Sequence, residues 1–141
     1  MKKTAILLAL LLAAGSPVHA QDAPPNRFAA TEIAAERFEV GALAVERHGK
    51  RGRPLILIPG LASGSWVWQD MIRTFRDDHV LYVVTLPGFD GRAPVAGNML
   101  EEVQRSLHQL VASRKLMKPV LVGHSLGGTL SLAIAEQDSD L

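Results

Sequence analysis

Cysteine is absent from the 141-residue sequence, which excludes disulfides, a thiol nucleophile, thiolate metal ligands and a lipidated cysteine anchor. A charge excess is also absent, because 15 Lys and Arg stand against 14 Asp and Glu and are interspersed with them along the chain. A nucleic-acid partner is therefore not expected. The sequence has no internal repeat and no low-complexity stretch, so it predicts one small globular domain rather than a solenoid.

A long apolar run is lacking as well, since a membrane-spanning helix needs about 20 apolar residues. The longest run, Ile6–Ala14, follows Lys2 and Lys3 and is followed by the small residues of Val18-His19-Ala20. This arrangement is typical of a signal peptide. We expect residues 1–20 to be cleaved off after Ala20, which changes the net charge from +1 to −1 because both lysines are lost. The mature protein is then periplasmic or secreted, without a stable membrane span.

The residues that follow divide into a lead-in arm and a folded unit. Residues 21–37 contain prolines, alanines and charges and are interpreted as an arm, partly helical over Ala29–Arg37. Residues 38–141 form the folded unit. Its first segment, Phe38–His48, alternates loosely around Gly41, which predicts an antiparallel hairpin or one bent strand.

Three short apolar runs, rich in Val, Ile or Leu and bounded by Pro or Gly, predict buried parallel strands: Leu55–Ile58, Val80–Leu86 and Val120–Val122. Two helical stripes lie between them, one formed by Trp68, Met71, Ile72 and Phe75, the other by Leu100, Val103, Leu107, Leu110 and Val111. Asn98 and Glu101 are expected to cap the second helix, and Arg114 and Lys115 suit the negative end of its dipole. The alternation of strands and helices predicts an α/β fold, a mainly parallel sheet with helices on both faces.

A motif that bears on chemistry follows the third run. Gly123-His124-Ser125-Leu126-Gly127-Gly128 stands between that strand and the helical segment Thr129–Glu136. A Gly-X-Ser-X-Gly pattern in this context predicts a tight, strained turn that lifts the serine hydroxyl above the sheet at a helix N-terminus. The alternatives are a glycine turn that only packs closely or one that binds phosphate, although no P-loop pattern is present.

The motif resembles the nucleophile elbow of the α/β-hydrolase superfamily, with Ser125 as nucleophile and Gly123 and Gly127 as the elbow glycines. Two further segments resemble that family: Leu57-Ile58-Pro59-Gly60-Leu61 its oxyanion-loop strand end, and Leu86-Pro87-Gly88-Phe89 its Pro-Gly-aromatic turn. The resemblance implies the sheet order 1-2-4-3-5-6-7-8, in which the three apolar runs are strands 3, 4 and 5.

On this mapping strands 3 and 5 are neighbours, so the loops at their carboxyl ends are adjacent. The backbone N–H groups of Leu61 and Leu126 are then the candidate oxyanion-hole donors. Family members often carry His-Gly where this chain has Pro59-Gly60, but a backbone donor survives that replacement. The alternative for Pro59-Gly60-Leu61 is a simple strand-ending turn.

Several other residues are weighed against structural roles. Trp66 and His124 are candidate pocket-lining residues, and Asp90 and Arg92 are more in keeping with an exposed turn than with catalysis. The remaining mature-chain histidines, His48, His79 and His108, are interpreted as structural or surface residues. No histidine and carboxylate spacing suggests a metal site, and no cofactor is expected.

The resemblance also implies a catalytic triad in the order Ser, Asp or Glu, His. After Ser125 the sequence offers three acids, Glu136, Asp138 and Asp140, and no histidine. We therefore expect the N-terminal half of a hydrolase, truncated after strand 5 and nearly inactive alone. The complete protein is expected to be a serine hydrolase that cleaves carboxylic esters of small molecules through an acyl-enzyme. A haloperoxidase-like or acyltransferase relative, and a non-catalytic pairing module or inactive fragment, remain open.

Overall fold

The computed structural model describes residue 33 and residues 35–137. The expected signal peptide, residues 1–20, and nearly all of the expected arm lie outside the described residues. The elements in chain order are β1 (Glu36–Val40), β2 (Leu43–His48), β3 (Pro54–Ile58), η2 (Ser65–Trp68), α1 (Gln69–Phe75), β4 (Val80–Thr85), α2 (Met99–Arg114), β5 (Val120–Gly123) and α3 (Leu126–Gln137).

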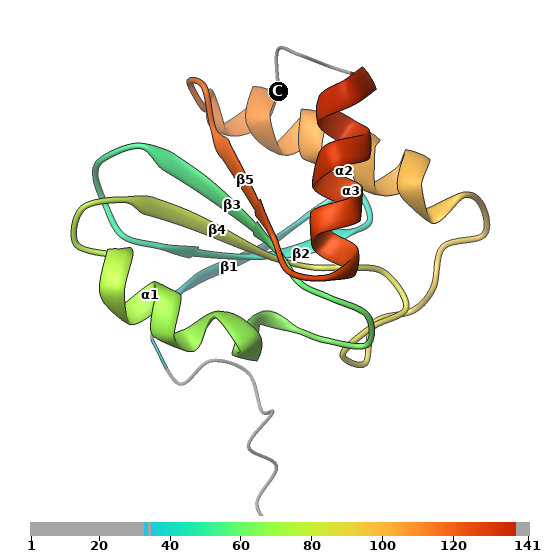
Figure 1. Cartoon of the computed structure of the whole chain (residues 1–141), viewed down its shortest axis with the longest axis horizontal. Coiled ribbons are helices and arrows are strands. Elements are labelled where there is room, and N and C mark those ends of the chain that lie inside the picture. The colour runs from blue at the N-terminus through green and yellow to red at the C-terminus, as the bar shows by residue number, and fades with distance from the viewer. Residues whose placement is uncertain (1–32, 34, 138–141) are drawn as a thin grey trace, which may run out of the picture.

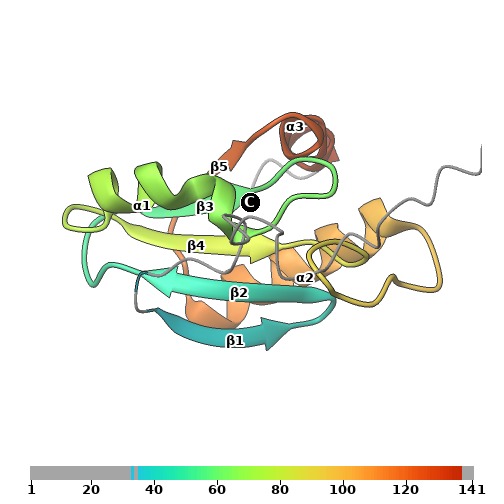
Figure 2. The ribbon, with the colours of Figure 1, turned by 90° about the horizontal axis from the view of Figure 1, so that it is seen from below.

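The strands form one mixed sheet in the order β1-β2-β4-β3-β5. β1 and β2 form an antiparallel hairpin, β2 pairs antiparallel with β4, and β4, β3 and β5 run parallel (Figure 2). The expected α/β fold class is confirmed, and of the hairpin and the single bent strand it is the hairpin that forms. The five described strands follow the first five positions of the order that the resemblance implies. The helix expected over Ala29–Arg37 is wrong at its C-terminal end, because Glu36 and Arg37 pair with β2 as part of β1.

Successive residues of the central strands serve two cores, as the pleat of a strand requires. Leu55 and Leu57 face the side covered by η2 and α1, where Trp68 and Ile72 are buried. Ile56 and Ile58 face the opposite side. There they pack with the buried residues of α2 and α3, namely Val103, Leu107, Leu110, Leu130 and Ile134. Figure 1 shows α1 below the sheet and α2 and α3 above it.

The ends of α2 follow the expected capping chemistry with one difference. Asn98 Oδ1 accepts a hydrogen bond from the Leu100 N–H at 3.0 Å, which satisfies one free donor of the first turn. Glu101 accepts from the side-chain amide of Asn98, not from its backbone N–H as in a full capping box. At the other end Arg114 pairs with Glu36 at 2.9 Å and stacks over the ring of Phe38.

The helical stripe predicted between the first two parallel strands holds only in part. Trp68 belongs to the 3-10 turn η2 and Ile72 to α1, and both side chains are buried. Phe75 was expected in the stripe but is 37% exposed, with its ring edge-on to His79. Phe75 is the last residue of the helix, and its ring contacts His79 instead of being buried with Trp68 and Ile72.

β5 is the edge strand of the described sheet, and all four of its residues are half-buried, whereas Leu55–Ile58 of the neighbouring strand are buried. In the described ranges, no helix combines the length and the apolar character needed to cross a bilayer.

Candidate active site

The turn between β5 and α3 has the strained geometry that the motif predicts. Ser125 has a backbone φ of +52°, in the left-handed region that L-residues with a side chain rarely occupy. Its side chain is exposed at the carboxyl end of β5, directly before the first turn of α3. The hydroxyl is therefore accessible from solvent and lies at a helix N-terminus.

Glycines on either side of the serine allow this turn to form. A Cβ on Gly123 would collide with the backbone of Gly127, and a Cβ on Gly127 would collide with the carbonyl oxygen of Ile58. The incoming strand, the outgoing helix and β3 thus approach too closely for any side chain. This close approach is the physical reason for glycine two residues before and two residues after the serine.

Hydrogen bonds hold the turn against its neighbours. The His124 N–H donates to the Ile58 carbonyl at 3.1 Å, which links the elbow to the end of β3. The Ser125 carbonyl accepts from the N–H groups of Gly128 and Thr129 at 2.8 and 3.2 Å. The backbone of Ser125 is consequently fixed from both sides, by β3 and by the first turn of α3.

The loop after β3 lies against the elbow. A Cβ built on Gly60 would lie 3.3 Å from the Cβ of Ser125. The loop is a tight turn, closed by a hydrogen bond from the Ser63 N–H to the Gly60 carbonyl at 3.3 Å, and Ala62 within it has a φ of +53°. Such a turn leaves the N–H of its second residue, Leu61, unused.

The two expected oxyanion donors stand in equivalent places. Ile58 and Gly123 are partners in the β3–β5 ladder, and Leu61 and Leu126 each come three residues later. Among the described residues, neither of their N–H groups donates a hydrogen bond. The two adjacent loops therefore each carry one backbone N–H without an acceptor among the described residues.

A cavity of about 510 Å³ opens beside the elbow. It is lined by Ser63, Trp66, Val67, Trp68 and His124. The two expected pocket residues, Trp66 and His124, thus lie on the wall of the same cavity. Ser125 itself does not line the cavity, which reaches the elbow through His124.

Asp90 and Arg92, expected in an exposed turn, differ from each other in the structure. Asp90 is exposed, has a φ of +49° and lies against Gly64 of the loop after β3. Arg92 is only partly exposed, and its guanidinium donates to Glu39 Oε1 at 2.9 Å and to the Ala42 carbonyl at 3.3 Å. The expectation of an exposed turn is therefore wrong for Arg92, which ties the β4–α2 loop to the β1–β2 hairpin.

A buried polar cluster lies away from the serine. His48 Nε2 lies 3.4 Å from Glu46 Oε2, and Glu46 Oε1 accepts from the Ser65 hydroxyl at 3.0 Å. His48 is 3% exposed and its Nδ1 has no partner among the described residues. The sequence predicts His48 to be a structural or surface residue, and the structure shows that it is buried. Its partners were not predicted, because only the period of two within β2 indicates that Glu46 and His48 share a face.

The described residues do not complete a catalytic triad. Within them, no hydrogen bond reaches the Ser125 hydroxyl, and no group of three or more His, Asp or Glu could hold a metal ion. Glu136 is exposed near the end of α3. The site as described therefore provides a serine and two backbone donors, without a group positioned to take the proton of the serine.

Comparison with known proteins gives matches over the part of the chain that contains β3 to α3. The model of the alpha/beta hydrolase family matches residues 55–140. The 2-succinyl-6-hydroxy-2,4-cyclohexadiene-1-carboxylate synthases of Escherichia coli O8 (strain IAI1) and Shigella sonnei (strain Ss046) are 34% identical over 95 residues. The alignment covers 67% of this chain and 37% of each synthase, so the chain spans little more than a third of the length of these relatives.

Solved structures of hydrolases have a similar fold over most of this chain. A marine microorganism esterase is 26% identical, with a TM-score of 0.62 over 76% of this chain and 39% of its own. An alpha/beta hydrolase fold protein from Burkholderia ambifaria is 21% identical, with a TM-score of 0.64 over 79% of this chain and 42% of its own. A variant of a Vigna radiata epoxide hydrolase is 19% identical, with a TM-score of 0.65 over 77% and 36%. The last two, at this identity, are similar in fold alone.

Proposed function

Because the chain belongs to the alpha/beta hydrolase family, we propose that it supplies the nucleophile and oxyanion hole of a serine hydrolase that cleaves carboxylic esters. The observation that carries this proposal is the left-handed backbone of Ser125 at the end of β5. Ala62, Asp90, Lys115 and Lys118 also have a positive φ. Ser125 differs from them because the close approach of β3, β5 and α3 enforces its conformation between a strand and a helix, and such strain is concentrated at functional sites.

In the proposed reaction the Ser125 hydroxyl attacks the ester carbonyl and its proton passes to a general base. The carbonyl oxygen becomes an oxyanion that accepts hydrogen bonds from the N–H groups of Leu61 and Leu126. Collapse of the tetrahedral intermediate expels the alcohol and leaves an acyl group on Ser125, which water then removes. Each donor typically contributes about 3–4 kcal/mol to lowering the barrier.

The proposal requires a general base and its orienting acid from residues outside those described here. A serine hydroxyl without a base is a weak nucleophile near neutral pH. The complete polypeptide is therefore the proper subject of an activity test. Export after cleavage behind Ala20 remains part of the proposal and is checked by the N-terminal sequence of the protein recovered from the periplasm or medium.

A fluorophosphonate probe, which reacts covalently with activated serines, tests the proposal on the full-length product of the gene. Labelling should be lost in Ser125→Ala and retained in Ser113→Ala, which removes a hydroxyl from α2 away from the site. Equal labelling of Ser125→Ala and the unaltered protein would show that Ser125 is not the reactive serine.

The synthases among the relatives supply a second candidate. Their 34% identity over 95 residues favours a reaction that forms a cyclic carboxylic acid, in which the same backbone donors stabilise a developing negative charge. Formation of the cyclohexadiene carboxylate for which those synthases are named, with no hydrolysis of a panel of p-nitrophenyl esters, would favour this candidate. Ester hydrolysis lost in Ser125→Ala would favour the first.

A further inference from the structure

Three loops lie side by side at the edge of the sheet opposite Ser125. Residues 49–53 lead into β3, residues 76–79 into β4 and residues 115–119 into β5. These strands are parallel neighbours in the order β4, β3, β5, so their amino ends share one edge. Ser125 follows the carboxyl end of β5 and therefore lies at the other edge.

These loops carry a group of cations without acidic partners. Their basic residues, which we call the basic rim, are Lys50, Arg51, Arg53, Arg76, Lys115 and Lys118. Among the described residues, none of the six forms an ion pair with a carboxylate. The other described Lys and Arg residues all do: Arg37, Arg47, Arg73, Arg92, Arg105 and Arg114.

The rim is positive because the loops contain few acids. Asp77 and Asp78 are the only carboxylates in the three loops. Arg51 donates to the Asp77 backbone carbonyl at 3.1 Å, and Arg53 donates to the Lys118 carbonyl at 3.2 Å. Neutral carbonyl groups thus orient these guanidinium groups without cancelling their charge. All six rim residues are exposed, so their charges are available to a partner.

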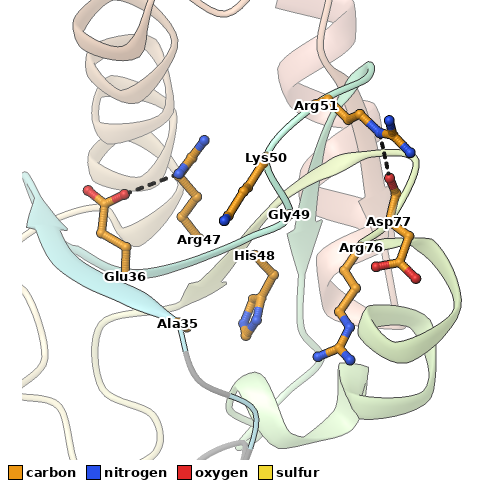
Figure 3. A pocket seen from close by; sticks show the side chains of 9 residues that line it. All are labelled: Ala35, Glu36, Arg47, His48, Gly49, Lys50, Arg51, Arg76 and Asp77. Atoms are coloured by element: carbon orange, nitrogen blue, oxygen red, sulfur yellow. Dashed lines mark hydrogen bonds and ion pairs between the residues drawn. The ribbon is translucent and has the colours of Figure 1, made fainter.

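A cavity of about 690 Å³ opens within this edge. Figure 3 shows Lys50, Arg51 and Arg76 around it, with Arg47 and Glu36 paired at one side. Its floor is formed by the end of β2, where His48 and Gly49 lie. Two acids also line the cavity, Glu36 in its pair with Arg47 and Asp77 next to Arg76 in the chain. Lys50, Arg51 and Arg76 form no ion pair with a carboxylate among the described residues, and the volume leaves room for a phosphate-bearing head group beside them.

Exposed apolar side chains accompany the cations. Met117 is 77% exposed between Lys115 and Lys118, and Phe75 is 37% exposed one residue before Arg76. A mixture of cations and isolated apolar side chains suits a surface that is anionic outside and apolar just beneath. A single-stranded nucleic acid would instead call for a row of aromatic side chains on which bases stack.

We propose that the basic rim docks the protein on a membrane surface rich in anionic phospholipids. The rim cations contact lipid phosphates, and Met117 and Phe75 enter the interfacial layer. The attraction is electrostatic and shallow, so the protein binds reversibly and does not span the bilayer. Docking by this edge leaves the Ser125 edge facing the aqueous phase, where a water-soluble substrate reaches it.

Co-sedimentation with vesicles tests the proposal on the purified protein. It should bind vesicles of phosphatidylcholine with phosphatidylglycerol, bind phosphatidylcholine alone at least tenfold more weakly, and dissociate as salt is raised. Lys50→Glu and Lys118→Glu should each lower the partition coefficient about fivefold or more, since each loses one attraction and adds a repulsion. Met117→Ser should lower it while leaving the salt dependence unchanged.

Arg105→Glu is the matched control, because it makes the same change of charge on the exposed side of α2, away from the rim. Its partition coefficient should change less than twofold. An effect of Arg105→Glu equal to that of Lys118→Glu would overturn the proposal, because the binding would then follow net charge alone. Stronger binding to duplex DNA than to anionic vesicles at equal phosphate concentration would also overturn it. Circular dichroism of each variant shows whether the fold is retained.

Discussion

The N–H of His124 donates to the carbonyl oxygen of Ile58 at 3.1 Å, so the residue before the proposed nucleophile is bonded to the strand before the proposed oxyanion loop. This bond continues the β3–β5 ladder one step beyond the last paired residues, Ile58 and Gly123. The spacing between the loops that carry Leu61 and Leu126 is therefore set by backbone pairing. Substitutions that alter backbone conformation or remove a backbone N–H should therefore affect this site more than substitutions that change only a side chain.

The left-handed backbone of Ser125 predicts that glycine at this position stabilises the fold more than alanine does, the reverse of the order in a helix interior. Ser125→Gly should be more stable to unfolding than Ser125→Ala by about 1 kcal/mol, because glycine adopts a φ of +52° without strain. Urea denaturation of both variants measures the difference. At Ser131, within α3, the order should be reversed, because glycine in a helix interior is about 1 kcal/mol less favourable than alanine.

The close contact of Gly127 with β3 predicts opposite results at two adjacent glycines. Gly127→Ala should destabilise the protein by about 2–3 kcal/mol, because its methyl group would collide with the Ile58 carbonyl. Gly128→Ala should be neutral or stabilising by up to about 1 kcal/mol, since its nearest neighbour lies at 3.5 Å and alanine favours a helix. Similar losses in thermal unfolding of the two variants would contradict the packing seen here.

If the N–H of Leu61 is an oxyanion donor, kcat should depend on the presence of this N–H and hardly on the side chain of Leu61. Leu61→Pro removes the N–H and should lower kcat of the complete enzyme by about 10²–10³. Proline is favoured at the second position of such a turn, so the loop should keep its shape. Leu61→Ala, which keeps the donor and removes a 69% exposed side chain, should stay within a few-fold of the unaltered enzyme. Steady-state kinetics on an ester substrate distinguishes the two results.

The contacts of Arg92 predict a structural role across a long loop. Arg92→Ala should destabilise the protein by about 1 kcal/mol, because it removes hydrogen bonds to Glu39 and to the Ala42 carbonyl. Arg105→Ala loses only an exposed pair with Glu102 and should change stability by less than about 0.5 kcal/mol. If the two variants have the same unfolding midpoint, Arg92 does not hold the hairpin in place.

Local patterns carried most of the correct structural predictions. The apolar runs of β3, β4 and β5 are bounded by Pro or Gly and are long enough only for strands. The elbow was predictable because glycine is required wherever backbones approach as closely as Gly127 and Ile58 do. The local sequence was sufficient to predict these strands and the elbow, because the steric and burial constraints that define them act over a few consecutive residues.

Contacts between distant residues were not predictable from one sequence. Ser65 meets Glu46 across 19 residues, and Arg92 meets Glu39 across 53. The basic rim also follows from topology, because cations interspersed with acids along the chain are gathered at one edge by crossovers that return to it. Phe75 was misassigned because a helical stripe alone does not show how many of its residues the core covers.

The order β2-β4-β3 has a consequence for the chain as it is being synthesised. β3 follows the hairpin in sequence but is separated from it in the sheet by β4, so both lack a neighbour until β4 has left the ribosome. During that interval the apolar segment Leu55–Ile58 is available to other nascent chains. The yield of folded protein is therefore expected to depend on how soon the chain through Thr85 is free to pair between β2 and β3, and on whether a chaperone covers β3 before then.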